Sequence, residues 1–276
     1  PPSLGMSYLG EFFGMDSDME WHVDLPFYRP VRLNHWIIGG DNGWHGVGAL
    51  KPYQIDNVPG VVEVGRGSPN WGQFYEHNQF PERYRDTFFV CDYRWKSATS
   101  GGYNSTGRLV AFHLKLDGAN WTGEVEEFAK GKPGGVDGNG TAINFGLVDL
   151  EIAPDGSLVF SDHNQGIWRL FYDPTNDYKK NGPPSLKPKR IVWPSDQAAF
   201  LKTLLTLPQP MSEWTRLQEV RGFELAKFDL AQALQEYVFV EKNSLRRRLR
   251  AFRLLASSFA GLPTEFAKNF AASSEP

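Results

Sequence analysis

The chain has 276 residues, of which 41% are hydrophobic and 22% are charged, a composition typical of globular rather than disordered proteins. The formal net charge of -3 provides no basic excess for a nucleic-acid partner, and no apolar run reaches the ~20 residues that span a bilayer. The single cysteine, Cys91, excludes an internal disulfide framework and a cysteine-rich metal site. Without a C-x-x-C-H motif, no haem is attached covalently within this chain.

The first two thirds of the chain has the pattern of an all-β protein. Aromatic residues make up 14% of the sequence, and 28 glycines and 19 prolines accompany them. Short runs of strand-forming residues alternate with turn signals such as Leu116–Gly118 and Pro154–Gly156. The pattern predicts strands over 87–92, 108–115, 123–128, 147–153, 157–161 and 166–172.

The order of these strands favours a β-propeller. Residues 147–172 offer three successive strands of one blade, 72–130 offer the four strands of another, and 31–65 offer an incomplete third. We therefore predict a partial propeller of two to three four-stranded blades over residues 1–173. Closed propellers have ~4–8 blades. The sequence, which starts at Pro1 without an initiator methionine, is thus expected to be a fragment whose partners are the remaining blades or other subunits.

The chain changes character after residue 173. Residues 174–194 contain five prolines and predict a linker. Residues 195–276 then follow a helical period and predict HEAT-like helical hairpins. We expect helices from Ser195 to Leu205, from Ser212 to about Glu236, after Asn243 as a cap, and over 264–272. The basic run Arg246, Arg247, Arg248 and Arg250 is interpreted as a solvated helix face.

Several segments of the chain resemble a known family. They are 16–21, 26–30, 32–35, 39–44, 67–69 and 116–124. Together they resemble the membrane-bound-dehydrogenase-like β-propeller proteins of planctomycetes and their relatives. In that family a propeller similar to soluble quinone-dependent glucose and sorbosone dehydrogenases precedes HEAT-type repeats. The resemblance extends from about Phe13 to Tyr172 and would place the chain at the C-terminal part of the propeller.

The resemblance implies a secreted or periplasmic protein, associated with a membrane only through partners. It also implies oxidation of a sugar or alcohol hydroxyl by pyrroloquinoline quinone, with calcium, and electron transfer to a c-type cytochrome. The chain departs from the family pattern at 93–106 and after Phe160. A non-catalytic propeller and helical-repeat scaffold, or a binding subunit of a larger assembly, therefore stays open. A third hypothesis is carbohydrate binding by Trp36, Trp44, Trp71 and Trp95, although we favour the alternative that their rings belong to the core of the blades.

Alternating carboxylates near the N-terminus form a candidate metal site. Asp16, Asp18 and Glu20 lie two residues apart in a predicted loop. Carboxylate oxygens are the ligands that Ca²⁺ prefers, in sets of ~6–8. The sequence therefore predicts a possible calcium site, with a polar turn as the alternative.

A second group of polar residues is the candidate cofactor site. Arg29, Arg32 and Asn34 offer the bidentate cations and the amide that a carboxylated quinone requires, and His35 offers a base for the hydroxyl proton. The resemblance implies that the Arg and Asn lie on the propeller axis. In a strand, Arg32 and Asn34 share one face, while His35 lies on the other. The alternative is that Arg and Asn join neighbouring blades and that His35 belongs to the wall.

Overall fold

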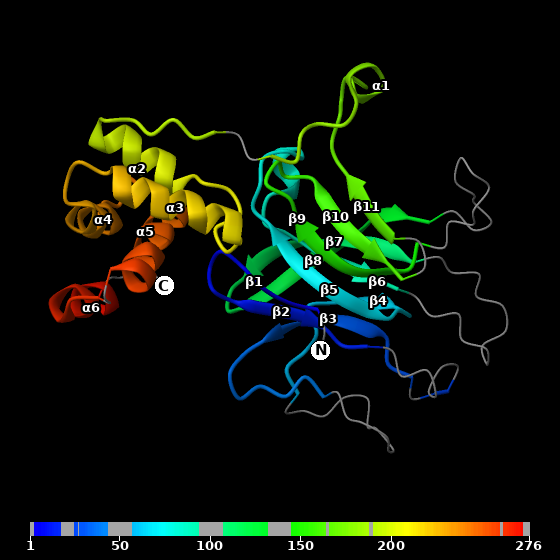
Figure 1. The fold of residues 1–276 in the computed structure, drawn as a ribbon. Coiled ribbons are helices and arrows are strands. Elements are labelled where there is room, and N and C mark those ends of the chain that lie inside the picture. The colour runs from blue at the N-terminus through cyan, green and yellow to red at the C-terminus, as the bar shows by residue number, and fades with distance from the viewer. Residues whose placement is uncertain are drawn as a thin grey trace. The chain divides into compact units, whose positions relative to one another are not determined.

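The fold is given by a computed structural model that describes residues 3–17, 25–26, 28–43, 57–93, 107–131, 145–163, 166–187, 190–259 and 262–272. The chain divides into two compact units, Pro1–Lys187 and Pro188–Pro276. Figure 1 shows the first as sheets and the second as helices. The prediction of a mainly β chain with a C-terminal helical part is therefore confirmed.

The first unit contains three antiparallel sheets in which strands that follow one another along the chain are paired. The first sheet consists of β1 (Leu4–Met6), β2 (Phe12–Met15), β3 (Val31–Trp36) and β4 (Val62–Gly65). The second consists of β5 (Pro69–Tyr75), β6 (Thr87–Asp92), β7 (Arg108–Asp117) and β8 (Asn120–Lys130). A short 3-10 helix, Glu82–Tyr84, connects β5 with β6. The third consists of β9 (Leu147–Ile152), β10 (Leu158–Asp162) and β11 (Gly166–Leu170).

All six strands predicted from the pattern are present, as β6 to β11. The first sheet is more complete than expected, because β1 and β2 precede the segment in which only an incomplete unit was predicted. Strand β2 is only four residues long and contains Gly14, which hides its alternation. The glycine is required there, since a Cβ atom would lie 2.6 Å from Nε1 of Trp36 and 2.7 Å from the carbonyl oxygen of Ser3.

Two apolar layers hold the three sheets together. One lies between the first and second sheets and includes Phe13, Leu33 and Phe88. The other lies between the second and third sheets and includes Phe89 and Phe160. The second sheet is therefore buried on both faces, which explains why 87–92 is a continuous apolar run rather than an alternating one. Strand β5 lies beside both β1 and β9, and β4 lies beside β8. Strands at the same position in their sheets therefore adjoin one another.

The second unit contains α2 (Gln197–Leu205), α3 (Glu213–Leu225), α4 (Leu230–Val238), α5 (Leu245–Ser258) and α6 (Thr264–Ala271). The prediction of one helix from Ser212 to about Glu236 is wrong: two helices form, because the Asp229 carboxylate accepts a hydrogen bond from Gln232 N and starts α4. A short helix, α1 (Tyr178–Asn181), lies in the predicted linker. No described helix is long and apolar enough to cross a membrane.

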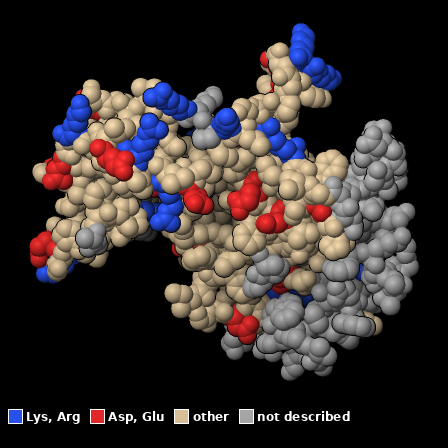
Figure 2. All heavy atoms as spheres, viewed as in Figure 1, with Lys and Arg blue, Asp and Glu red and all other residues tan. Residues whose placement is uncertain are grey.

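The basic run on α5 is only partly a solvated face. Arg248 and Arg250 are each 7% exposed, which contradicts the sequence interpretation for these two residues. The Nε group of Arg248 donates to the Val238 carbonyl at 2.6 Å, and Arg250 pairs with the buried Glu219 of α3. These arginines therefore join helices of the unit. On the face drawn in Figure 2, basic and acidic side chains are interspersed over the described surface.

Cys91 is fully buried on β6, and its thiol is expected to be inert in the folded protein. Burial, followed by the nearby charges of Asp149 and Asp92, raises the pKa of this thiol, so the reactive thiolate is scarce. We predict that an aromatic disulfide reagent modifies Cys91 about a hundredfold more slowly in buffer than in urea. Equal rates would show that the sheets open readily around β6.

Candidate functional site

Asp16 and Arg32 form a buried ion pair between β2 and β3. The Nη2 and Nε groups of Arg32 donate to Oδ2 of Asp16 at 2.7 and 3.1 Å. The backbone N–H of Arg32 donates to Oδ1 at 2.6 Å. The side chains are only 1% and 5% exposed, so both charges depend on each other for stabilisation. The predicted calcium ligand and the predicted cofactor ligand thus contact each other.

The same pair recurs in the second sheet. Asp92, at the end of β6, accepts from Nε of Arg108, at the start of β7, at 2.8 Å. Its other oxygen accepts from Ser68 N at 2.8 Å. In both sheets the aspartate lies at or just after the end of the second strand, and the arginine follows sixteen residues later at the start of the third strand. We call each Asp–Arg pair a strand latch.

The third sheet keeps the aspartate of the latch. Asp162 ends β10, is 6% exposed and accepts from Gly146 N at 3.1 Å. Strand β11 begins with Gly166 and carries no arginine at its start. The sequence contained a signal that was missed: two Phe-Phe-x-x-Asp segments, at 12–16 and 88–92, are each followed by an arginine sixteen residues after the aspartate.

Several buried polar atoms of Arg32, of Asn34 on the same strand and of Asn42 have no hydrogen-bond partner among the described residues. Nη2 of Arg32 donates to the Asn42 carbonyl at 2.8 Å. Nη1 of Arg32 and the side-chain amides of Asn34 and Asn42 are buried and make no hydrogen bond among the described residues. Each such group costs about 1–3 kcal/mol unless water or a ligand satisfies it. We call Asp16, Arg32, Asn34 and Asn42 the polar cluster.

The other two predicted site residues, His35 and Arg29, make different contacts. His35 lies on the opposite face of β3, where its Nε2 contacts Glu11 Oε2 at 2.6 Å and its ring stacks on Phe13 at 5.0 Å. Nη1 of Arg29 donates to the Gly43 carbonyl at 2.8 Å. On β3, the predicted base His35 therefore faces one side of the sheet, and the predicted cofactor ligands Arg32 and Asn34 face the other side.

Two of the three predicted calcium ligands, Asp18 and Glu20, lie outside the described residues. Asp16 is held by Arg32, as described above. Within the described ranges, no three His, Cys, Asp or Glu side chains gather around a common point. Of the predicted stacking tryptophans, Trp71 is 41% exposed, and Trp44 and Trp95 lie outside the described residues.

The described residues do not by themselves fit a carboxylated quinone. Asp16 balances the charge of Arg32, and Arg32 and Asn34 are 1% and 0% exposed.

Comparison with known proteins finds likeness only among solved structures. No family model and no curated protein matches the chain. An oxidoreductase from Thermus thermophilus, described as a glucose dehydrogenase, is 16% identical with a TM-score of 0.41 over 61% of this chain. A soluble aldose sugar dehydrogenase from Escherichia coli is 13% identical with a TM-score of 0.40 over 62% of this chain. The chain spans 44% of the length of each of these structures. Its structural neighbours are thus sugar dehydrogenases at low identity.

Proposed function

We propose that this chain is a structural and binding part of a larger, dehydrogenase-like propeller protein. The three antiparallel sheets are its blades, and the second unit supplies HEAT-like helical hairpins. Further blades or other subunits complete the assembly. In this proposal the described residues at the latches hold strands together and perform no redox chemistry.

The single observation that supports this proposal is the repetition of the strand latch. A residue that binds a cofactor is needed at one site, whereas an ion pair that holds two strands together can recur in every sheet with the same strand arrangement. Arg32 and Arg108 occupy equivalent positions in consecutive sheets and engage equivalent aspartates. The role of Arg32 is therefore best explained by what it shares with Arg108.

A second candidate function is oxidation of a sugar or alcohol by the complete protein, in the periplasm or outside the cell. Pyrroloquinoline quinone and calcium would be the cofactors, and a c-type cytochrome would accept the electrons. The specific observation in its favour is that the buried side-chain amides of Asn34 and Asn42, and Nη1 of Arg32, make no hydrogen bond among the described residues, so a polar ligand could satisfy them. The quinone would then require further ligands from outside the described residues.

The equivalence of the two latches provides a matched test of these functions. We predict that Arg32→Lys and Arg108→Lys change the affinity for pyrroloquinoline quinone, measured by absorbance titration with Ca²⁺, by less than about twofold. Lysine keeps the positive charge but loses the forked contact, so each variant perturbs its latch in the same way. Dye reduction over a panel of sugars is measured in parallel.

The two functions give different patterns across this pair. A loss of about tenfold or more in quinone affinity for Arg32→Lys, with Arg108→Lys unchanged, would establish the dehydrogenase function and remove the structural one. Equal and small effects support the structural function. Circular dichroism on each variant confirms that the titrated protein is folded.

A further inference from the structure

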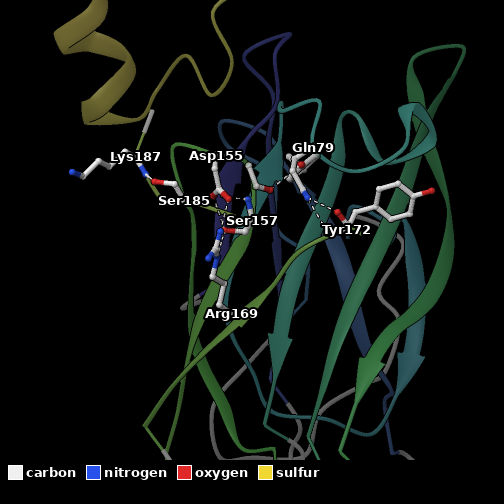
Figure 3. Close-up of polar contacts among 9 residues, drawn as sticks. Gln79, Asp155, Ser157, Arg169, Tyr172, Ser185 and Lys187 are labelled. Atoms are coloured by element: carbon white, nitrogen blue, oxygen red, sulfur yellow. Dashed lines mark hydrogen bonds and ion pairs between the residues drawn. The ribbon is translucent and has the colours of Figure 1, made fainter. Parts of the chain in front are cut away.

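The chain that follows the third sheet is exposed to solvent over nearly its whole length. Residues 174–187 are all exposed, and α1 has no buried residue. Figure 1 shows α1 at the tip of a stretch of chain that extends away from the sheets of the first unit. The start of this stretch is fixed, because the N–H of Tyr172 donates to Oε1 of Gln79 at 3.1 Å and Nε2 of Gln79 donates to the Tyr172 carbonyl at 2.8 Å (Figure 3). We call residues 173–187 the exposed segment.

The order of the exposed segment comes almost entirely from its own residues. The Asp173 carboxylate accepts a hydrogen bond from Tyr178 N at 3.1 Å, and the Tyr178 ring lies 5.8 Å from that of Phe171. Beyond α1, the N–H of Lys187 donates to Ser185 Oγ at 3.2 Å (Figure 3). Isolated helices shorter than ~12–15 residues are marginal in water. Helix α1, with four residues and none buried, is therefore expected to open easily at its ends.

An Asn–Gly pair lies at the end of α1. Asn181 is the last residue of the helix, and Gly182 follows with a φ of 75°. Glycine has no Cβ atom and adopts many backbone conformations, so its nitrogen can approach the side-chain amide of the preceding asparagine. The side chain of Asn181 makes no hydrogen bond among the described residues. The N–H of Gly182 donates to the Tyr178 carbonyl at 2.9 Å, and fraying of this last turn releases it.

A second Asn–Gly pair, in the first sheet's neighbourhood, is held quite differently. Asn42 is 3% exposed, and its carbonyl accepts from Nη2 of Arg32 at 2.8 Å. The N–H of Gly43 donates to Oδ1 of Asp41 at 2.6 Å, and the Gly43 carbonyl accepts from Nη1 of Arg29 at 2.8 Å. The nitrogen and the side-chain amide that would react there are thus fixed apart by the fold. The same dipeptide is open at 181–182 and protected at 42–43.

We propose that Asn181 is a site of spontaneous covalent modification in the folded protein. The nitrogen of Gly182 forms a bond to Cγ of Asn181, and the bond from Cγ to Nδ2 breaks. Nδ2 leaves as ammonia after taking up the proton of the Gly182 N–H, and a succinimide ring remains. Water then opens the ring at either of its carbonyl groups and leaves aspartate or isoaspartate at position 181. The reaction requires no enzyme, oxidant or cofactor.

The modification changes the charge and the main chain of the exposed segment. Either product adds a negative charge close to Lys179, Lys180 and Lys187. The new carboxylate lies at the C-terminal end of α1, where the helix dipole disfavours negative charge, and isoaspartate also adds a methylene group to the main chain. Helix α1 should therefore be less stable after the reaction. The apolar layers of the first unit and the helical core contain no residue of the exposed segment, so they should not change.

Incubation of the purified protein in mildly alkaline buffer, followed by peptide mapping with tandem mass spectrometry, tests this proposal. We expect Asn181 to lose ammonia at least about a hundredfold faster than Asn42, because the fold must open before Asn42 can react. In urea both pairs are exposed, and the two rates should agree within about tenfold. Asn139, in an Asn–Gly pair outside the described residues, is followed on its own peptide. Isoaspartate should separate by chromatography from the peptide of Asn181→Asp, which has the same mass.

Asn181→Gln is the matched variant, because the longer side chain closes the corresponding ring far more slowly. It should leave the exposed segment unmodified. Equal rates for Asn181 and Asn42 in the folded protein would show that the fold does not select the site. Reaction of Asn181 in urea but not in buffer would show that α1 protects it. A gain of mass in the exposed segment of Asn181→Gln would assign the reaction to Asn176 instead. Each of these three results would overturn the proposal.

Discussion

Replacing Arg108 by methionine is expected to lower the free energy of unfolding of the first unit by about 3–5 kcal/mol. The change leaves the Asp92 carboxylate, 1% exposed, with a backbone N–H from Ser68 and without its cation. An uncompensated charge in this position costs more than the pair contributes, because water cannot reach it. Arg32→Met should have a similar effect through Asp16, since that latch is buried to the same degree.

Urea unfolding of each variant, followed by the reactivity of Cys91 so that only the first unit is observed, measures the effect. Asp92→Leu combined with Arg108→Met is the control, because removing both charges together should recover most of the loss. A midpoint shift worth less than about 1 kcal/mol for either single variant would show that the latch is not a stabilising device.

Phe89→Ala is expected to destabilise the first unit by about 3–5 kcal/mol. Phe89 is fully buried and lies in the layer between the second and third sheets, with Tyr75 and Phe128 at ring distances of 5.9 and 5.0 Å. Truncation removes apolar area from the layer and leaves a cavity that two stacked sheets cannot close by small shifts.

Phe12→Ala provides the matched control for that cavity. Phe12 is 44% exposed on β2, so the same deletion removes less buried surface and should cost less than about 1 kcal/mol. Thermal or urea unfolding of the two variants gives the comparison. Equal losses of unfolding free energy for the two variants would mean that the layer between the second and third sheets contributes little to stability, although Phe89 is fully buried.

Residue types alone could not show whether Arg32 belongs to a structural ion pair or to a cofactor site. Arginine, asparagine and histidine over 32–35 have the chemistry of a cofactor site, and the alternation of a strand correctly separates His35 from Arg32 and Asn34. The sequence does not show that Asp16 lies against Arg32, because the residues that pair are far apart in the chain. The sixteen-residue spacing between aspartate and arginine indicates a recurring ion pair only because it occurs twice, in Asp16–Arg32 and in Asp92–Arg108.

The sequence by itself determined the strands β6 to β11, the change to helices after residue 195 and the turns at Gly118 and Gly156, where φ is positive at 61° and 88°. These features depend on short-range alternation and on backbone conformations that favour glycine. Only the tertiary structure decided that Asp16 and Arg32 share one pair and that Arg248 and Arg250 are buried. Those outcomes depend on which residues, far apart in the sequence, the fold brings together away from water, and residue type alone does not predict that.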